Sequence, residues 1–505
     1  MNTSDYRREF AAFHSAIQEE KYHQHQHPTL DKDLNLQRIS ERYADLYTLD
    51  AIHDLEEKLK DESAFGIERE GLRKLYDGAR IHYAQGEARE IDAELKNCTG
   101  AARVEWRGTS LHARDVMERV LLETNSSERR ELAARWLDVL RPCDDLKYAR
   151  KRILDEAAHR LEFDSFLALH HRAEGVDVQA LIISSKELLE LTASVYYREL
   201  ALALQRYLPG TVIGEATYAD EVFFKRAAQF DDYFPAKGTA AVYQATMKSL
   251  GIDSTNQRKN IKFEKQTASA TASGCFAVNV PDDIRLSISG ATGANVCAKA
   301  ISEGARAQHY SWTSSDLSAR YPEFVRSPDR ATNEGHTVLF RYLFLDSLWL
   351  AEHLGNLRPS QTSEITRFFA LVELHDLRSC AARLQIEATK MQDDSLAEAN
   401  KQSQMMSEAS GFQLPHGAFL WLNEQTHTAT TFLRARMFAA HMREHLRTRH
   451  GSRWWASRGA RDELIDIWNT ASRYSVEELA QLTGAGEMSN FDLLIEMLTK
   501  TLNED

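Results

Sequence analysis

Three charged side chains in the second half of the chain have the types and the spacing of an acid–base site. Glu303 and Arg306 lie in the segment AISEGARAQHYSW (300–312), and Glu334 follows in a second helix-like segment. Side chains three or four positions apart share one face of a helix, so Glu303 and Arg306 would point the same way. Glu303 could move protons, and Arg306 could bind a carboxylate or stabilise a developing negative charge. These three residues form the predicted catalytic group.

The same segment has the frame of a zinc-binding helix. In His-Glu-x-x-His, the two histidines share one helical face and bind the metal, while the glutamate acts as general base on the bound water. Here Ser302 and Arg306 stand at the histidine positions, and Glu303 stands at the position of the base. Serine is a poor zinc ligand, and arginine keeps its proton. We therefore expect neither zinc nor any other cofactor at this site.

The order of the neighbouring segments makes this frame more specific. A small predicted sheet and a glycine-bearing turn precede the helix, and an aromatic segment and a second helix follow it. The segments are, in order, Pro281-Asp-Asp-Ile-Arg285, the turn at 290–293, Ser302-Glu-Gly-Ala-Arg306, Tyr310-Ser-Trp312, Tyr321-Pro-Glu-Phe324 and Asn333-Glu-Gly-His336-Thr-Val-Leu-Phe340. This order resembles the thimet oligopeptidase and oligoendopeptidase F superfamily of gluzincin metallopeptidases. The resemblance covers most of the chain beyond residue 40.

The resemblance implies a fold and a place for the ligand. Members of this superfamily carry a second helix of the kind Thr-Glu-Gly-x-Ala-x-Leu-Phe, whose glutamate is the third zinc ligand, and Glu334 matches that glutamate. The implied fold is mainly α, a two-lobed zincin-like architecture with a deep central channel and one small β-sheet next to the active-site helix. A small-molecule or peptide-like ligand would bind in the channel. The zinc chemistry is not carried over, because Ser302 and Arg306 replace two ligands.

Three functions are compatible with the altered site. The sequence favours a metal-independent enzyme that acts on a small or peptide-like metabolite by rearrangement, cyclisation or elimination. The first alternative is a non-catalytic pseudopeptidase, in which Arg306 forms a salt-bridged cluster with Glu303 and Glu334 and replaces the metal as a cross-link between two helices. The second alternative is a metallopeptidase with a rebuilt site that adds His309 and His336. For these two histidines we expect packed or hydrogen-bonded side chains rather than metal ligands.

Further residues are candidates for binding the substrate. Ser302, His309, Tyr310 and His336 lie in or beside the motif segments, and Lys265 and Arg285 flank the predicted sheet. Basic and histidine side chains also recur at helical spacing near the C-terminus, where we expect a charged face in solvent. They are Arg434, Arg436, His441 and His445. Trp454 and Trp455 are expected to fill the core between the last helices.

The hydrophobic pattern divides the chain into three parts. Residues 1–34 are polar, and the tract His23-Gln-His-Gln-His27 is typical of a solvated tail. Residues 35–210 repeat apolar side chains every three or four positions, which predicts a helical lobe. Residues 211–505 form a zincin-like catalytic-type lobe. It contains a small sheet at about 261–289, the motif helices at about 293–350 and the C-terminal helices.

Composition excludes several classes of partner. The net charge of −13 argues against a nucleic-acid partner, and no apolar run is long enough for a membrane span. The five cysteines are widely spaced and form no Cys-x-x-Cys pair, so we expect neither a disulfide framework nor a zinc ribbon. These features favour a protein of the reducing cytoplasm.

Overall fold

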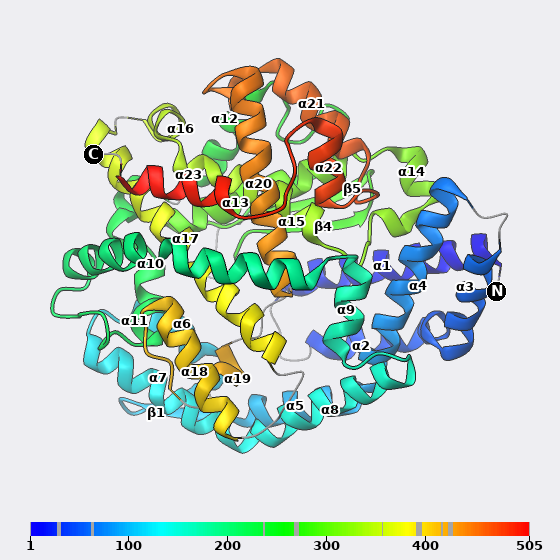
Figure 1. Ribbon diagram of the computed structural model, residues 1–505, viewed down its shortest axis with the longest axis horizontal. Coiled ribbons are helices and arrows are strands. Elements are labelled where there is room, and N and C mark those ends of the chain that lie inside the picture. Colours follow the sequence, from blue (N-terminus) through cyan, green and yellow to red (C-terminus); the bar gives the residue numbers. More distant parts are fainter. Residues whose placement is uncertain are drawn as a thin grey trace.

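The computed structural model describes residues 2–27, 32–61, 65–235, 238–266, 272–355, 357–389, 396–415, 418–422 and 428–503. Helices dominate the fold, and a small sheet lies beside the helices that carry the motifs (Figure 1). The two ends of the chain lie on opposite sides of the molecule (Figure 1). This is the mainly α architecture expected from the sequence. In the part of the chain described, no helix combines the length and apolar character needed to cross a bilayer.

The N-terminal helix α1 (Thr3–Gln26) is packed on the rest of the protein, so the expectation of a solvated tail is wrong. Tyr6, Phe10 and Phe13 recur every three or four residues and are buried, and His25 hydrogen bonds to the hydroxyl of Ser287 in the sheet at 3.0 Å. This apolar stripe is short, and the polar residues around it conceal it in the average composition. The next helices are α2 (Lys32–Arg42), η1 (Ala44–Tyr47), α3 (Leu49–Lys60) and α4 (Gly66–Glu87).

The following helices confirm the helical pattern predicted for 35–210, with one exception. They are α5 (Arg89–Ala101), α6 (Ala113–Leu122), α7 (Ser126–Leu140), η2 (Arg141–Cys143), α8 (Asp144–Arg160), α9 (Phe166–Glu174) and α10 (Val178–Tyr207). The exception is an antiparallel hairpin between α5 and α6, formed by β1 (Arg103–Trp106) and β2 (Thr109–His112). Its two-residue turn, Arg107-Gly108, has positive φ at both positions, which is typical of hairpin turns.

A disulfide joins Cys98 of α5 to Cys143 of η2, a pair that the expectation of no disulfide framework did not foresee. The two cysteines are 45 residues apart in sequence, and packing of α5 against η2 brings their Cα atoms to 6.0 Å. No local motif marks such a pair. Cys275, Cys297 and Cys380 are free thiols. The cytoplasmic location stays a prediction, and this disulfide does not support it.

The central sheet falls within the range predicted at 261–289. Its strands are β3 (Ile261–Lys265), β4 (Gly274–Asn279) and β5 (Asp283–Ile288), in the order β3-β5-β4. β3 runs parallel to β5, and β4 runs antiparallel to it. Before the sheet come α11 (Tyr218–Lys225), η3 (Ala228–Tyr233) and α12 (Thr239–Leu250).

The motif helices follow the sheet directly in sequence, and α13 and α15 of this group lie near the centre of the molecule (Figure 1). They are α13 (Ala294–Trp312), α14 (Ser315–Arg320), η4 (Pro322–Phe324), α15 (Ala331–Arg341), η5 (Tyr342–Leu345) and α16 (Ser347–His353). The C-terminal helices are α17 (Pro359–Thr389), α18 (Leu396–Ser410), α19 (Ala418–Leu422), α20 (Ala429–His450), η6 (Trp454–Ala456), α21 (Arg458–Asn469), α22 (Val476–Thr483) and α23 (Asp492–Asn503). Trp454 and Trp455 are fully buried, as expected.

Candidate functional site

Two glycines allow the motif helices to approach their neighbours closely. At Gly304 of α13, a Cβ atom would collide with the ring of Tyr243 on α12, and at Gly335 of α15 it would collide with Phe438 on α20. Both glycines lie next to the candidate residues, Gly304 after Glu303 and Gly335 after Glu334. Close packing at these two glycines therefore fixes the backbone positions from which the side chains of Glu303 and Glu334 extend.

Arg306 joins α13 to α15 through a cluster of ion pairs. Its Nη1 and Nη2 donate to the two carboxylate oxygens of Glu334 at 2.9 and 3.0 Å, and its Nε donates to Oε2 of Glu303 at 3.2 Å. Nη1 also donates to the side-chain oxygen of Asn333. Burial alone would lower the pKa of Arg306, but the carboxylates of Glu303 and Glu334 raise it well above its usual range. The three residues predicted as a catalytic group are thus brought together.

Glu303 is engaged at both carboxylate oxygens. Lys299, one turn earlier on α13, lies 2.7 Å from Oε1, while Arg306 occupies Oε2. The Glu303 side chain is only 7% exposed, whereas that of Lys299 is 55% exposed. The cluster therefore reaches solvent mainly through Lys299.

The side chains at the motif positions do not fit a zinc ion. The hydroxyl of Ser302 donates to the carbonyl of Ala298 at 2.9 Å, within its own helix, and the Arg306 guanidinium lies against the carboxylate that would be the third ligand. A cation fixed in this position would repel a metal ion. Among the described residues, the only group with metal-ligand geometry is His53, Glu56 and Glu57, on the distant helix α3.

His309 and His336 are packed side chains, as expected. Each is 1% exposed, and their rings lie 4.7 Å apart. His309 also stacks on Tyr310 and lies 3.2 Å from the side-chain amide of Asn333, through Nδ1. Burial lowers the pKa of His309 to about 4 and holds that of His336 well below its usual range. Both imidazoles are therefore neutral at physiological pH.

Arg285 and Lys265 lie on the sheet rather than in the cluster. Arg285 pairs with Asp283 at 3.0 Å and with Glu19 of α1 at 3.2 Å, and its guanidinium lies over the ring of Tyr22. Lys265, at the end of β3, is exposed. The structure brings neither residue to Arg306, and their role in substrate binding stays a prediction.

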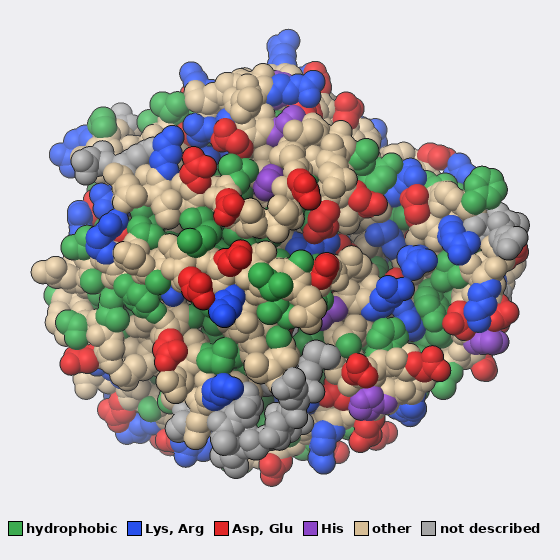
Figure 2. All heavy atoms as spheres, in the orientation of Figure 1, with side chains coloured by type: hydrophobic (Ala, Val, Ile, Leu, Met, Phe, Trp, Pro, Cys, Tyr) green, Lys and Arg blue, Asp and Glu red, His purple; other side chains and the backbone are tan. Residues whose placement is uncertain are grey.

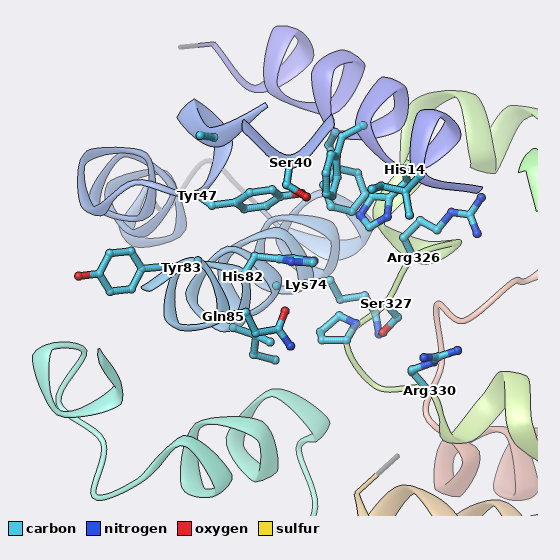
Figure 3. Close-up of a pocket in the computed structure, with 18 of the residues that line it drawn as sticks. His14, Ser40, Tyr47, Lys74, His82, Tyr83, Gln85, Arg326, Ser327 and Arg330 are labelled. Atoms are coloured by element: carbon cyan, nitrogen blue, oxygen red, sulfur yellow. The ribbon is translucent and has the colours of Figure 1, made fainter. Parts of the chain in front are cut away.

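A cavity of about 890 Å³ lies beside the cluster. Its walls come from α1, α2, η1 and α4 and from the segment 325–330 that precedes α15 (Figure 3). Tyr310 and Asn333 line it, so two neighbours of Arg306 face the cavity, whereas Glu303, Arg306 and Glu334 are not part of its lining. Such a volume suits a small-molecule ligand.

Four basic side chains of this cavity were missed by the sequence analysis. Lys21 comes from α1 and Lys74 from α4, and Arg326 and Arg330 come from the segment before α15. No short motif contains them, because they come from three distant parts of the chain. Lys21, Arg326 and Arg330 line one cavity, and burial, followed by the charges of Arg330 and Arg326, lowers the pKa of Lys21.

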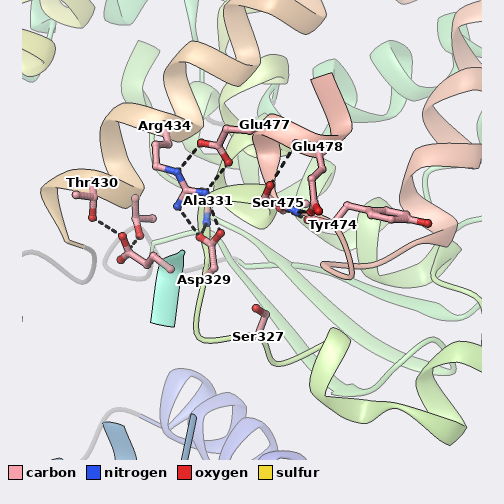
Figure 4. Close-up of polar contacts among 12 residues, drawn as sticks. Ser327, Asp329, Ala331, Thr430, Arg434, Tyr474, Ser475, Glu477 and Glu478 are labelled. Carbon is pink, nitrogen blue, oxygen red and sulfur yellow. Dashed lines mark hydrogen bonds and ion pairs between the residues drawn. The ribbon is translucent and has the colours of Figure 1, made fainter. Parts of the chain in front are cut away.

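A buried ion-pair network holds the segment that carries Arg326 and Arg330. Arg434 of α20 binds the carboxylate of Asp329 at 3.0 and 3.2 Å and that of Glu477 at 2.7 Å (Figure 4). Arg434 and Arg436 are 2% and 6% exposed, so the expected solvent-facing charged surface is wrong for these two residues. Helical spacing alone cannot distinguish a charge in solvent from a charge paired with a carboxylate far along the chain.

The fold is that of the zincin-like metallopeptidases. Trypanosoma cruzi metallocarboxypeptidase 1 superposes with a TM-score of 0.64 at 15% identity, over 99% of this chain and 100% of that one. The M32 carboxypeptidase from Deinococcus radiodurans R1 gives 0.61 at 10% identity, covering 98% of both chains. An oligoendopeptidase F from Bacillus anthracis gives 0.58 at 12% identity, over 97% of this chain and 94% of that one.

These likenesses confirm the resemblance at the level of the fold. The sequence matches no protein-family model and no curated protein. Activity must therefore be argued from the side chains of this chain rather than from its structural neighbours.

Proposed function

We propose that this protein is a non-catalytic pseudopeptidase, which binds a small-molecule or peptide-like ligand in its cavity. The observation that carries the proposal is that every guanidinium nitrogen of Arg306 is already hydrogen-bonded within the protein. All three of its guanidinium nitrogens donate to Glu303, Glu334 or Asn333. These bonds use four of the five N–H groups, so among the described residues one N–H of Nη2 alone is left for a substrate carboxylate or an oxyanion.

The state of Glu303 supports the same proposal. A general base needs a carboxylate oxygen within hydrogen-bond reach of the proton that it abstracts. Both oxygens of Glu303 are paired, with Lys299 and Arg306, and neither residue lines the cavity. Freeing this carboxylate would leave a buried charge without its partner, which is costly. The ion pairs are better suited to holding α13 and α15 together than to moving protons.

A metal-independent enzyme is the second candidate function, and a specific observation favours it. Asn333 accepts a hydrogen bond from Arg306 and also lines the cavity. Tyr310, one helical turn after Arg306, lines the cavity too. A ligand that displaced Asn333 from Arg306 would gain access to the guanidinium. The metal-independent enzyme that the sequence favours is therefore compatible with the structure, because displacement of Asn333 would bring a ligand in the cavity to Arg306.

Two assays separate these functions. In the first assay, the protein is incubated with a broad peptide library and added zinc. In the second, it is incubated with a metabolite extract. Mass spectrometry compares each mixture before and after incubation. The proposal predicts no peptide cleavage and no consumption of any metabolite beyond stoichiometric binding. Turnover that disappears in Glu303→Gln and Arg306→Met would establish the enzyme instead, with Arg320→Met as the matched control because Arg320 is exposed and lies outside the cluster.

A further inference from the structure

The cavity is basic although the protein as a whole is acidic. Five of its lining residues are lysine or arginine, and three are aspartate or glutamate, against a net charge of −13 for the chain. In the view of Figure 3, Arg326, Ser327 and Arg330 lie at one end, close to His14 and to the side chain of Lys74. The Lys74 ammonium donates to the hydroxyl of Ser327 at 3.1 Å.

The charge of Asp329 partly offsets the effect of burial on the pKa of Lys74, but the other cations of the lining have no such carboxylate bound to them among the described residues. Asp329 is bound by Arg434, and its Oδ1 also accepts the backbone N–H of Ala331, while Glu87 pairs with Arg160 at 2.6 Å. Asp50, the third acidic residue of the lining, lies in the first turn of α3. Within the described residues, Lys21, Arg326 and Arg330 form no ion pair with a carboxylate. Arg326 instead donates to the backbone carbonyl of Ala277.

Aromatic rings extend from the basic end to the other end of the cavity. Phe10 and Phe13 pack on His14, at 4.4 and 5.0 Å between ring centroids, and the ring of His82 lies 5.9 Å from that of Phe13 and 4.6 Å from that of Tyr47. Tyr47 and Tyr83 are on the opposite side of the view from Arg326 and Arg330 (Figure 3). Cations at one end and rings that extend away from them match a ligand with a charged end and an apolar body.

A buried nitrogen at the basic end also lacks a partner. His14 lines the cavity, its buried Nε2 has no hydrogen-bond partner among the described residues, and burial, followed by the charge of Arg326, holds its pKa well below the usual range. Like charges gathered in a cavity destabilise one another unless an anion is present. An anionic group beside Lys21, Arg326 and Arg330 would remove this repulsion.

We propose that the cavity binds an amphipathic small molecule whose carboxylate or phosphate group is held by Lys21, Arg326 and Arg330. Its apolar body packs against Phe13 and Tyr47. This inference rests on the proposed ligand-binding function and gives the chemical class of the ligand. Arg326 and Arg330 supply planar guanidinium groups, which bind both carboxylate and phosphate through paired hydrogen bonds.

The test uses pairs of probes that share a shape but differ in charge. Titration calorimetry compares 1-naphthaleneacetate with 1-naphthaleneacetamide, and 1-naphthyl phosphate with 1-naphthol, on the full chain. We expect each anion to bind about tenfold or more tightly than its neutral partner. The relative affinity of the carboxylate and the phosphate then shows which anionic group the cavity prefers.

Two kinds of variant assign the binding to this cavity. Lys21→Gln and Arg330→Gln should remove the preference for the anion, because each replaces a cation of the cavity lining with a neutral side chain. Arg320→Gln is the control on α14. Gly78 lines the cavity with open space at its Cβ position, so Gly78→Phe should weaken binding of all probes, whereas Gly100→Phe, equally open but on α5, should not.

The outcomes are distinct. Preference for the anions that is lost in Lys21→Gln and Arg330→Gln supports the inference. Equal binding of charged and neutral probes that Gly78→Phe weakens would overturn the anionic ligand class and leave the proposed binding function standing. Absence of binding by every probe, or binding that neither set of variants changes, would overturn the inference. Turnover that depends on Glu303 would overturn the proposed function separately.

Discussion

Arg306 on α13 and Glu334 on α15 are joined by two parallel hydrogen bonds, at 2.9 and 3.0 Å. Their side chains are 13% and 14% exposed, so the pair is largely shielded from water. In the zinc motif, a metal joins the corresponding positions of the two helices. A bidentate arginine–carboxylate pair offers a comparable cross-link, because its planar fork fixes both distance and orientation.

Removing the Arg306 cation should strongly destabilise the protein. Arg306→Met leaves Glu303 and Glu334 in a buried site without their shared partner, and breaking a buried pair in this way costs about 3–5 kcal/mol. Urea denaturation measures the free energy of unfolding. Arg320→Met, in an exposed pair with Asp316, should change it by less than about 1 kcal/mol.

The carboxylates provide the complementary test of this cross-link. If uncompensated charge causes the loss, Glu334→Gln placed in the Arg306→Met background should recover part of the stability. A further loss of stability in the double variant would show that Glu334 is held by something other than Arg306.

Gly304 should not tolerate a side chain. A Cβ atom at this position meets the Tyr243 ring, so Gly304→Ala should destabilise the protein by about 1–3 kcal/mol through overpacking. Gly100→Ala is the matched helical control, because nothing lies within 4 Å of its Cβ position. This control should be neutral or stabilising by up to about 1 kcal/mol. Thermal unfolding of both variants checks the expectation, and equal melting temperatures would contradict it.

His309 should make the protein less stable in acid. Its pKa is lowered to about 4 by burial, against about 6.5 in an unfolded chain. Above pH 6.5 both states are neutral, and as the pH falls towards 4 only the unfolded state gains the proton, so stability falls by up to about 3 kcal/mol. His309→Gln should show a shallower loss between pH 7 and pH 4 in urea denaturation. Parallel pH profiles of the two proteins would rule out this role.

The disulfide between Cys98 and Cys143 should be detectable chemically. Denatured protein that has not been reduced should expose three reactive thiols, and reduced protein should expose five. Because the disulfide closes a loop of 45 residues, its reduction should cost about 2–4 kcal/mol of stability. Five reactive thiols in freshly purified, unreduced protein would show that the disulfide does not form in the producing cell.

The sequence predicts the centre of the fold well because its signals there are local. Val278, Ile284, Leu286 and Ile288 indicate the strands β4 and β5, and the order of the motif segments indicates a zincin-like fold. The hairpin of β1 and β2 escaped prediction, since each strand has only four residues and lies among strong helical patterns. The packing of α1 was also missed, although the spacing of Tyr6, Phe10 and Phe13 was a usable signal.

The site was predicted only in part, for a physical reason. Glu303, Arg306 and Glu334 share a motif frame, so their proximity could be inferred before the structure. Lys21 and Arg330 meet in the cavity only through the packing of α1 on the segment before α15, and no local pattern encodes that contact. The pairing of Lys299 with Glu303 changes the interpretation of the glutamate from a free base to a paired charge.

Zinc titration by calorimetry of the protein with Ser302 and Arg306 intact tests the central claim most directly. His53→Ala serves as the common background, because His53 belongs to the only group among the described residues whose side chains could hold a metal ion. If the Arg306 cluster replaces the metal, this protein binds no stoichiometric zinc, whereas the Ser302→His/Arg306→His double variant binds about one equivalent and loses it again on Glu334→Gln. Binding of about one equivalent of zinc by the protein with Ser302 and Arg306 intact would contradict the account.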